Sequence, residues 1–178
     1  MRWNKKFEYP KSIRSTENGI RRYLIGEKKL PSVTSILDAT KSEEDKAALV
    51  NWRERTGQKA SEAIVKAASN RGSKMHAYLE SYLLGQQNMS FFDDGEQYKK
   101  MAKQIIEKGL NNRFEEIWGV ECTLFKPDAY SGTCDAVGIY DGKETIIDFK
   151  QSNKPKKIEY IDTWLLQTAA YSLAHNTV

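Results

Sequence analysis

The sequence predicts an α+β fold in which helices flank a small, mixed but mostly antiparallel sheet. Apolar residues recur at helical spacing through residues 33–112. From about Trp118 onward, runs rich in β-branched and aromatic residues replace that pattern, and a last helical stretch begins near Ile158. Helices, then strands, then a closing helix are typical of an α+β domain.

The first part of the chain, residues 1–32, is expected to be a strand and loop segment. Asn18-Gly19 favours a tight turn, so the run from Ile20 to Ile25 is expected to pair across it as a short hairpin. Hydroxyl side chains follow Pro31, where a helix is expected to start.

Glycines and a capping pattern divide the helical part, residues 33–112. Ser42-x-x-Asp45 is a capping box in front of a helix. Gly57 interrupts the apolar periodicity, and Gly72 is expected to separate a further helix that carries Met75 and Leu79. Residues 117–178 are assigned to a catalytic sheet and helix, which completes one domain over residues 1–178.

Composition narrows the class of protein. A chain of 178 residues with 39% hydrophobic and 29% charged residues suits one soluble domain. No apolar run approaches the roughly 20 residues of a membrane span, and no secretory signal is present, so we expect a cytoplasmic protein of a bacterium or a phage-infected cell. Cys122 and Cys134 are expected to be buried, reduced thiols. The net charge of +4 permits an anionic partner without requiring one.

The register of a predicted hairpin indicates the first candidate site. Asp141-Gly142 lies between two strand-like runs and is a strong hairpin signal. Counting outward from this turn places Asp135 opposite Asp148, on one face of the hairpin. Period two puts Lys150 on the same face and Phe149 on the other, toward a core.

Two opposed carboxylates beside an ammonium group allow two interpretations. Like charges at directly opposite positions are destabilising, so a hard cation such as Mg²⁺ or Mn²⁺ held by Asp135 and Asp148 would compensate them. Lys150 would then orient the attacking water and offset the charge of a phosphate. The alternative is a surface salt-bridge patch, and these residues alone favour neither.

Five blocks add a resemblance to a known family. The sequence resembles the PD-(D/E)XK nuclease superfamily, specifically its RecB-like exonuclease branch and the phage-type relatives of mitochondrial genome maintenance exonucleases. The blocks occur in the family's order over nearly the whole chain: Pro31-Ser-Val-Thr-Ser-Ile-Leu, Arg71-Gly-Ser-Lys-Met-His76, Ser131-Gly-Thr-Cys-Asp135, Ile147-Asp-Phe-Lys150 and Gln167-x-x-x-Tyr171.

The resemblance implies a role for each matched position. Asp135 and Asp148 would be the metal carboxylates and Lys150 the catalytic lysine. The carbonyl of Phe149 would add a ligand, and His76 would contribute to the metal site. The remaining matched positions, on the helix after the catalytic strand, complete the implied catalytic set: Gln167 and Tyr171.

The sequence departs from the family in two places. Cys134 stands where the superfamily's name places proline, which is common in this branch. Relatives usually continue past the last motif with another strand and helix, whereas this chain ends seven residues after Tyr171, so we expect a fragment, an incomplete gene or a compact variant.

Residues around the core motifs are candidates for supporting roles. Glu80 lies one helical turn after His76 and would orient the imidazole or hold a metal-bound water. Glu121 would approach the site from the preceding strand. For both, a solvated surface glutamate is an equal alternative. On the last helix, Leu165, Leu166, Ala169 and Leu173 are expected to form the apolar side.

Other residues are candidates for contact with DNA. Thr34 and Ser35 at a helix start could bind phosphate or act only as caps. Trp52 and Arg53, with Arg55 and Lys59 nearby, could stack bases and follow a single strand, the alternative being a solvated helix with a buried tryptophan. Arg71 belongs to the block that ends in His76.

Together these observations predict an Mg²⁺- or Mn²⁺-dependent deoxyribonuclease with a restriction-endonuclease-like core. It would act as an exonuclease on DNA with single-stranded ends, in repair, recombination or phage DNA metabolism. Two alternatives stay open, a structure-specific endonuclease on the same fold and a non-catalytic nucleic-acid-binding module.

Overall fold

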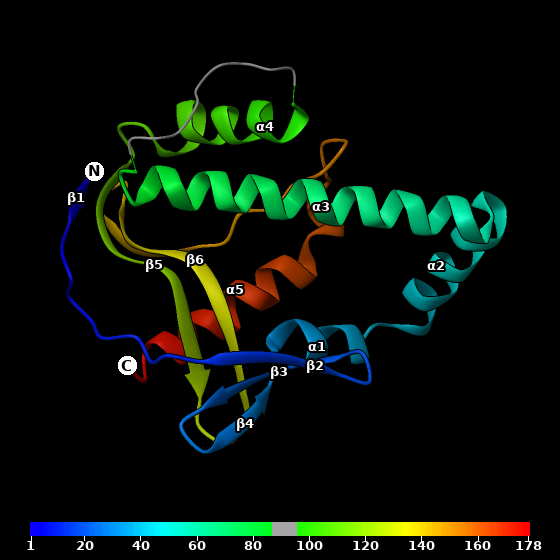
Figure 1. The fold of residues 1–178 in the computed structure, drawn as a ribbon, viewed down its shortest axis with the longest axis horizontal. Helices are drawn as coiled ribbons and strands as arrows, with labels where there is room; N and C mark the ends of the chain where they lie inside the picture. Colours follow the sequence, from blue (N-terminus) through cyan, green and yellow to red (C-terminus); the bar gives the residue numbers. More distant parts are fainter. Residues whose placement is uncertain (87–95) are drawn as a thin grey trace.

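The computed structural model describes residues 1–86 and 96–178, and its α+β architecture confirms the predicted fold class (Figure 1). Five α-helices occur in these residues, together with one π-helical turn over Ile106–Leu110 and one 3₁₀ turn over Ile158–Tyr160. The strands are β1 (Arg2–Trp3), β2 (Ile13–Glu17), β3 (Ile20–Ile25), β4 (Lys28–Pro31), β5 (Phe114–Lys126), β6 (Tyr130–Tyr140) and β7 (Lys143–Ile147). The helices are α1 (Val33–Ala39), α2 (Glu43–Thr56), α3 (Gln58–Leu83), α4 (Gln97–Ile105) and α5 (Asp162–His175).

The strands form two sheets. The larger has the order β1-β5-β6-β7, with β1 parallel to β5 and the other neighbours antiparallel, so it is mixed and mostly antiparallel as predicted. The smaller is the antiparallel meander β2-β3-β4, which contains the predicted hairpin at Asn18-Gly19. A bridge between Ser32 and Ser131 joins the end of the meander to β6.

The hairpin between β6 and β7 has the predicted register. Tyr140 pairs with Lys143 and Ala136 pairs with Ile147. The ladder ends there, so the expected continuation of the strand to Lys150 is wrong. The physical reason is that the side chain of Asp135 accepts the backbone N–H of Phe149, in place of a ladder partner.

Helix α3 is continuous across Gly72, so the prediction that this glycine separates two helices is wrong. The chain does break at Gly57, whose φ of 86° suits glycine. At Gly72 a Cβ would lie 3.6 Å from the Cγ of Gln151, an ordinary van der Waals distance, so the loop leaves room for a side chain there. The glycine therefore marks neither a helix end nor a close approach that requires it.

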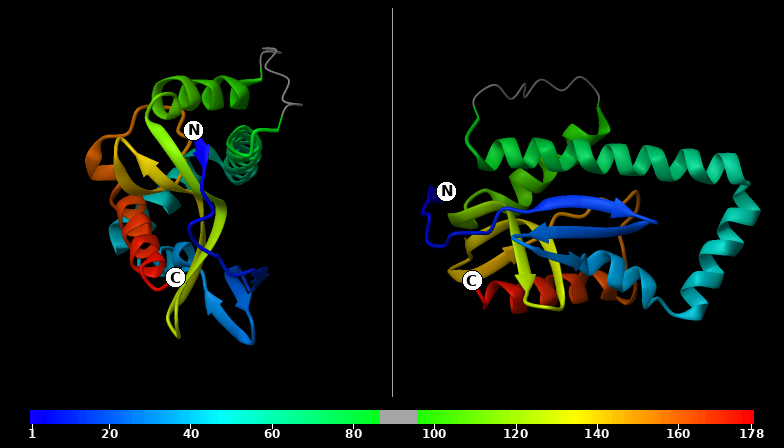
Figure 2. Two further views of the ribbon diagram at one scale, coloured as in Figure 1. Left: turned by 90° about the vertical axis from the view of Figure 1, so that its left-hand side faces the viewer. Right: turned by 60° about the horizontal axis from the view of Figure 1, so that its bottom comes forward.

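Helices cover both faces of the larger sheet, and Figure 2 shows α3 and α5 on opposite sides of its strands. On one side Met75 and Leu79 of α3 pack with Phe114, Phe149 and residues of α4. On the other side the core contains α1 and α5 residues and the following buried side chains: Trp118, Cys122, Leu124, Cys134 and Tyr171. The two cysteines are free and buried, as predicted.

The orientation of α5 differs from the prediction. Leu165, Leu166 and Leu173 are more than half exposed, whereas Gln167 and Tyr171 are buried at 6% and 3% exposure. Hydrogen bonds hold Gln167 in the interior, and this fixes which side of the helix faces the sheet. The leucines expected to form the buried side therefore face outward.

Helix α2 and the first half of α3 form an arm that projects from the body (Figure 1). No residue of α2 is buried. Trp52 is half-buried and belongs to neither hydrophobic core, so the alternative of a buried core tryptophan is not met. Within residues 1–86 and 96–178, no helix has the length and apolar character needed to cross a bilayer.

Candidate active site

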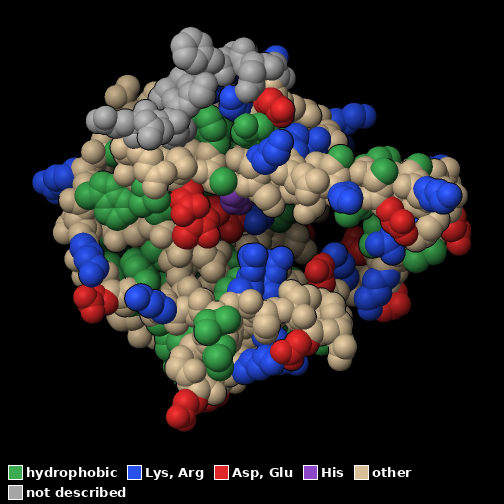
Figure 3. All heavy atoms as spheres, in the orientation of Figure 1, with side chains coloured by type: hydrophobic (Ala, Val, Ile, Leu, Met, Phe, Trp, Pro, Cys, Tyr) green, Lys and Arg blue, Asp and Glu red, His purple; other side chains and the backbone are tan. Residues whose placement is uncertain are grey.

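A polar cavity of about 360 Å³ lies between the two sheets, the middle of α3 and the inner face of α5. On this side of the molecule, Figure 3 shows acidic side chains, a histidine and a group of basic side chains close to one another. The cavity brings together most of the residues predicted from the sequence, namely Thr34, His76, Glu121, Asp135, Asp148, Lys150, Gln167 and Tyr171.

Three acidic residues stand in a row across the sheet. On β5 and β6, Glu121 occupies the position opposite Asp135, between the pairs Val120–Ala136 and Cys122–Cys134. On the other side of Asp135, Asp148 follows Ile147, the last paired residue of β7. Asp135 is therefore the centre of the row, with one carboxylate on each neighbouring segment.

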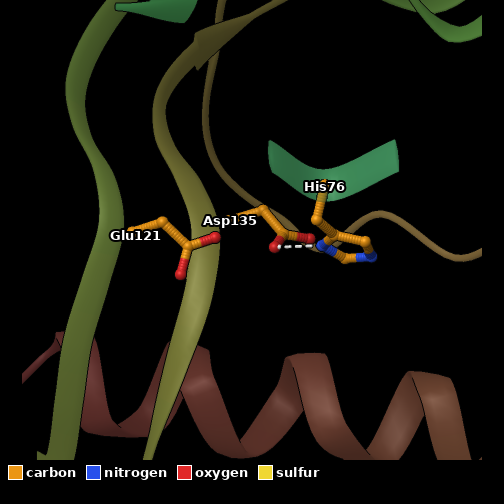
Figure 4. Close-up of side chains that lie close together, drawn as sticks. All are labelled: His76, Glu121 and Asp135. Carbon is orange, nitrogen blue, oxygen red and sulfur yellow. Dashed lines mark hydrogen bonds and ion pairs between the residues drawn. The ribbon is translucent and has the colours of Figure 1, made fainter. Parts of the chain in front are cut away.

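Asp135 is held at both carboxylate oxygens. Its Oδ1 lies 2.8 Å from Nδ1 of His76, which reaches down from α3 (Figure 4). Its Oδ2 accepts the backbone N–H of Phe149. The side chain is 8% exposed. The hydrogen bond to Asp135 raises the pKa of His76, and partial burial opposes that effect. The structure thus fixes the Asp135 carboxylate between a helix and the chain segment after β7.

Glu121 completes a cluster of three potential metal ligands. One ligand atom from each of His76, Glu121 and Asp135 lies within 4.8 Å of the other two, and Figure 4 shows the Glu121 and Asp135 carboxylates turned toward each other. The pKa of Glu121 is raised to about 7, first because its carboxylate is partly withdrawn from water, and then because of the charges of Asp135 and Glu80. Neighbouring carboxylates thus oppose the ionisation of Glu121.

Asp148 lies beside this cluster, in a different set of contacts. It forms an ion pair with Lys150, and its Oδ1 accepts a 3.2 Å hydrogen bond from Nε2 of Gln167. Burial raises the pKa of Asp148, and the charge of Lys150 acts in the opposite direction. Gln167 also donates to the hydroxyl of Tyr171 at 2.9 Å. The ring of Tyr171 lies against Gly132, where a Cβ would approach it to 2.5 Å, so the residue at this position must lack a side chain.

The other predicted residues occupy distinct positions. Arg71 lines no part of the cavity but holds the loop after Lys150, through hydrogen bonds to Gln151 at 2.9 Å and Asn153 at 2.6 Å. The ring of Phe149 is buried, and the implied ligand role of its carbonyl stays a prediction. Glu80 is half-buried and close enough to raise the pKa of Glu121.

The two hydroxyl residues at the start of α1 are used differently. Thr34 lines the cavity. Ser35 donates its backbone N–H to Ser32, the N-cap of α1, and its hydroxyl accepts the backbone N–H of Arg21. Ser35 therefore ties α1 to β3. The N-cap is Ser32, so the alternative that Thr34 and Ser35 are the caps is wrong, and their contact with phosphate stays a prediction.

Three cavity residues on the smaller sheet were not predicted from the sequence: Arg14, Arg21 and Tyr23. The predicted hairpin carried a usable signal, because counting outward from Asn18-Gly19 places all three on one face. What it could not supply was the position of that face over the site, which depends on how the two sheets meet.

The donor set fits a hard divalent cation. Carboxylates of Asp135, Glu121 and Asp148 are ligands that Mg²⁺ prefers, and an added imidazole from His76 suits Mn²⁺ well. The Glu121 carboxylate gives further support, because it faces Asp135 and a cation between the two would remove their repulsion.

The chain matches no protein-family model. It is 34% identical to mitochondrial genome maintenance exonuclease 1 of Mus musculus over 137 residues, which is 72% of this chain and 39% of the mouse protein. The Homo sapiens protein of that name is 27% identical over 83% of this chain and 44% of its own length. The Xenopus tropicalis protein is 31% identical over 83% of this chain and 43% of its own length. The chain thus spans less than half of the relatives it matches.

Proposed function

We propose that this chain carries the active site of a metal-dependent DNA exonuclease of the RecB-like branch of the PD-(D/E)XK superfamily. One observation carries the proposal: Asp135 stands between Glu121 and Asp148, in a cavity that also contains Lys150. The sequence similarity to proteins named exonucleases supports it independently.

The cation would be held by Asp135, with His76, Glu121 and Asp148 as the other available ligands. A divalent ion bound there supplies Lewis acidity to the scissile phosphate and lowers the pKa of water in its coordination shell. The substrate and water would complete its coordination, as is usual for Mg²⁺.

The surrounding side chains have separate tasks in this proposal. Lys150, 29% exposed at its side chain, reaches the cavity and would orient the attacking water or offset charge that develops on the phosphate. Gln167 would act as a positioning residue, because its amide holds Asp148 and contacts Tyr171. Arg71 would fix the loop that carries Lys150.

A single-stranded end is the proposed substrate. Figure 3 shows a hollow between the projecting arm and the body, close to the acidic side chains. Arg53, Arg55 and Lys59 on this arm are exposed and form no ion pair within residues 1–86 and 96–178. A strand that enters beneath the arm could contact these cations and Trp52 before it reaches the cavity. The proposed setting is repair, recombination or phage DNA metabolism in the cytoplasm.

The test is digestion of end-labelled linear DNA and of covalently closed circular single-stranded DNA, each with Mg²⁺, Mn²⁺ or EDTA. The exonuclease proposal requires cleavage of linear substrate only, dependence on the metal, and loss of cleavage in Lys150→Ala. Cleavage of closed circles would instead establish the endonuclease alternative. Metal-independent binding without any cleavage would establish a nucleic-acid-binding module. Digestion of RNA of the same sequence, compared with digestion of the DNA, shows whether the enzyme is a ribonuclease.

A further inference from the structure

Two arginines of the smaller sheet face the candidate active site. In the β2–β3 hairpin Arg14 pairs with Tyr23 and Thr16 pairs with Arg21, so Arg14, Arg21 and Tyr23 share one face. Diagonal neighbours of this kind lie about 7–8 Å apart. Tyr23 is 5% exposed and anchors this face in the interior, while both arginines are exposed and line the cavity.

Neither guanidinium group is neutralised by the protein. In the part of the chain that the structure describes, no hydrogen bond or ion pair involves the side chain of Arg14 or Arg21. Asp135 and Asp148, across the cavity, already have partners, since Asp135 binds His76 and Asp148 binds Lys150. Within the described residues, no ion pair joins either arginine to these carboxylates or to Glu121, so the cationic wall of the cavity has no acidic partner.

We propose that Arg14 and Arg21 form a phosphate clamp that holds the nucleic-acid backbone against the site, an inference that rests on the nuclease function proposed above. A guanidinium group matches two oxygens of a phosphate with two parallel N–H donors, and it stays charged at any physiological pH. Because Asp135, Asp148 and Lys150 are assigned to the scissile phosphate, the arginines on the opposite wall are assigned to a flanking phosphate.

This assignment has a chemical consequence. Every nucleotide carries the same phosphate, so a clamp of two arginines fixes the position of the strand without selecting its bases. The phosphate could be an internal diester or a terminal monoester, and both offer the same anionic oxygens to the clamp.

The test is the binding of a fluorescent oligothymidylate in EDTA, where no metal-dependent cleavage interferes. Arg14→Ala and Arg21→Ala should each weaken binding about tenfold, the loss expected for a hydrogen bond to a charged group. Each should also reduce the slope of log K against log salt by about 0.7, the value for one single-strand phosphate contact. Arg14→Lys and Arg21→Lys should restore the salt slope but only part of the affinity, because an ammonium group cannot bind the two oxygens in parallel.

Arg22→Ala is the matched control, because Arg22 carries the same charge on the same strand but belongs to the opposite face. It should bind as the parent does, and unchanged melting temperatures would show that all variants fold. Oligonucleotides with and without a terminal phosphate show which phosphate the clamp binds. If the arginine variants weaken binding only of the oligonucleotide that has the terminal phosphate, the clamp binds the terminus. If they weaken binding of both oligonucleotides, the clamp binds an internal phosphate.

The proposal is overturned if Arg14→Ala and Arg21→Ala match Arg22→Ala, or if the parent does not bind. Failure of the nuclease function is separable, because binding in EDTA does not depend on cleavage. If the parent binds through these arginines but cleaves no DNA with Mn²⁺, the phosphate clamp stands and the proposed nuclease function fails.

Discussion

Glu121 of β5 stands directly opposite Asp135 of β6, and it does so with a left-handed backbone φ of 50°. A non-glycine residue in this conformation costs on the order of 1–2 kcal/mol. Its carboxylate also approaches a second carboxylate within the His76 cluster. Backbone strain and charge repulsion thus coincide at one residue of the candidate metal site, as is common where a site is organised for a ligand.

The first prediction follows from this coincidence. Glu121→Asn should raise the free energy of unfolding in EDTA by about 1 kcal/mol, because asparagine tolerates the left-handed region and carries no charge. Glu121→Gln removes the charge but keeps the strained backbone, so its gain should be smaller. Urea unfolding measures both. Equal stability of parent and both variants would contradict the argument.

The second prediction concerns Asp148. Asp148→Asn should abolish cleavage while the melting temperature in EDTA stays unchanged or rises, because burial already opposes ionisation of this carboxyl group. Added Mn²⁺ should stabilise the parent and have much less effect on the variant. A thermal-shift titration measures this. Asp128→Asn, at an exposed turn, should respond to Mn²⁺ as the parent does; equal responses of parent and Asp148→Asn would exclude Asp148 from the metal site.

The sequence predicted this part of the site because short turns fix strand register. The turn at Asp141-Gly142 allows one strand register, and the observed pairs from Tyr140–Lys143 to Ala136–Ile147 have that register. The same counting about Asp128, which also has a left-handed φ, would have placed Glu121 opposite Asp135. That signal was present but weaker, because Pro-Asp-Ala does not define one turn type.

Other features depend on contacts between distant segments, which local patterns do not encode. Gly72 looks like a helix end, yet α3 continues through it, 26 residues from Gln58 to Leu83. The leucines of α5 look like its buried side, yet the hydrogen bonds of Gln167 turn the other side inward. For α5 the deciding interaction is the hydrogen bond between Gln167 and Asp148, which no local pattern encodes.

The third prediction separates positioning from chemistry. Gln167 touches Asp148 and Tyr171, so Gln167→Ala should leave the assigned ligands present but less well oriented. We expect kcat to fall about 10- to 100-fold with little change in KM, the range for partners that orient metal ligands. Steady-state kinetics on a linear oligonucleotide with Mn²⁺ measures this. Leu166→Ala, at an exposed neighbouring position, is the control; a rise in KM alone would show that Gln167 binds substrate.

The fourth prediction concerns acid stability and lies outside the site. Hydrogen bonds from Arg2, Asn4 and Trp118 lower the pKa of Glu116 from 4.5 to about 2. A carboxyl group with a lowered pKa in the folded state stabilises the protein above its unfolded pKa. This contribution should disappear as pH falls from about 4.5 toward 2.

Urea unfolding between pH 6 and pH 2 tests this contribution. Glu116→Gln should be less stable than the parent near pH 6, and the difference should shrink as the pH falls. Glu115→Gln removes a charge from the adjacent, exposed position and should show no such convergence. A difference between parent and Glu116→Gln that stays constant over this range would disprove the assigned pKa shift.

The last prediction tests whether the projecting arm guides a free end. Arg53→Ala should weaken binding of single-stranded ends at every sequence and reduce the salt slope by about 0.7. Trp52→Ala should cost roughly 1–3 kcal/mol of binding with little change in the salt slope, because stacking is not ionic.

Trp52 is half-buried and outside both cores, so its loss should not unfold the chain. Neither residue touches the acidic cluster, so residual cleavage should keep its Mn²⁺ dependence. Lys143→Ala, on the exposed start of β7, is the control for charge. If Trp52→Ala and Arg53→Ala bind linear ends as the parent does, the strand does not pass beneath the arm.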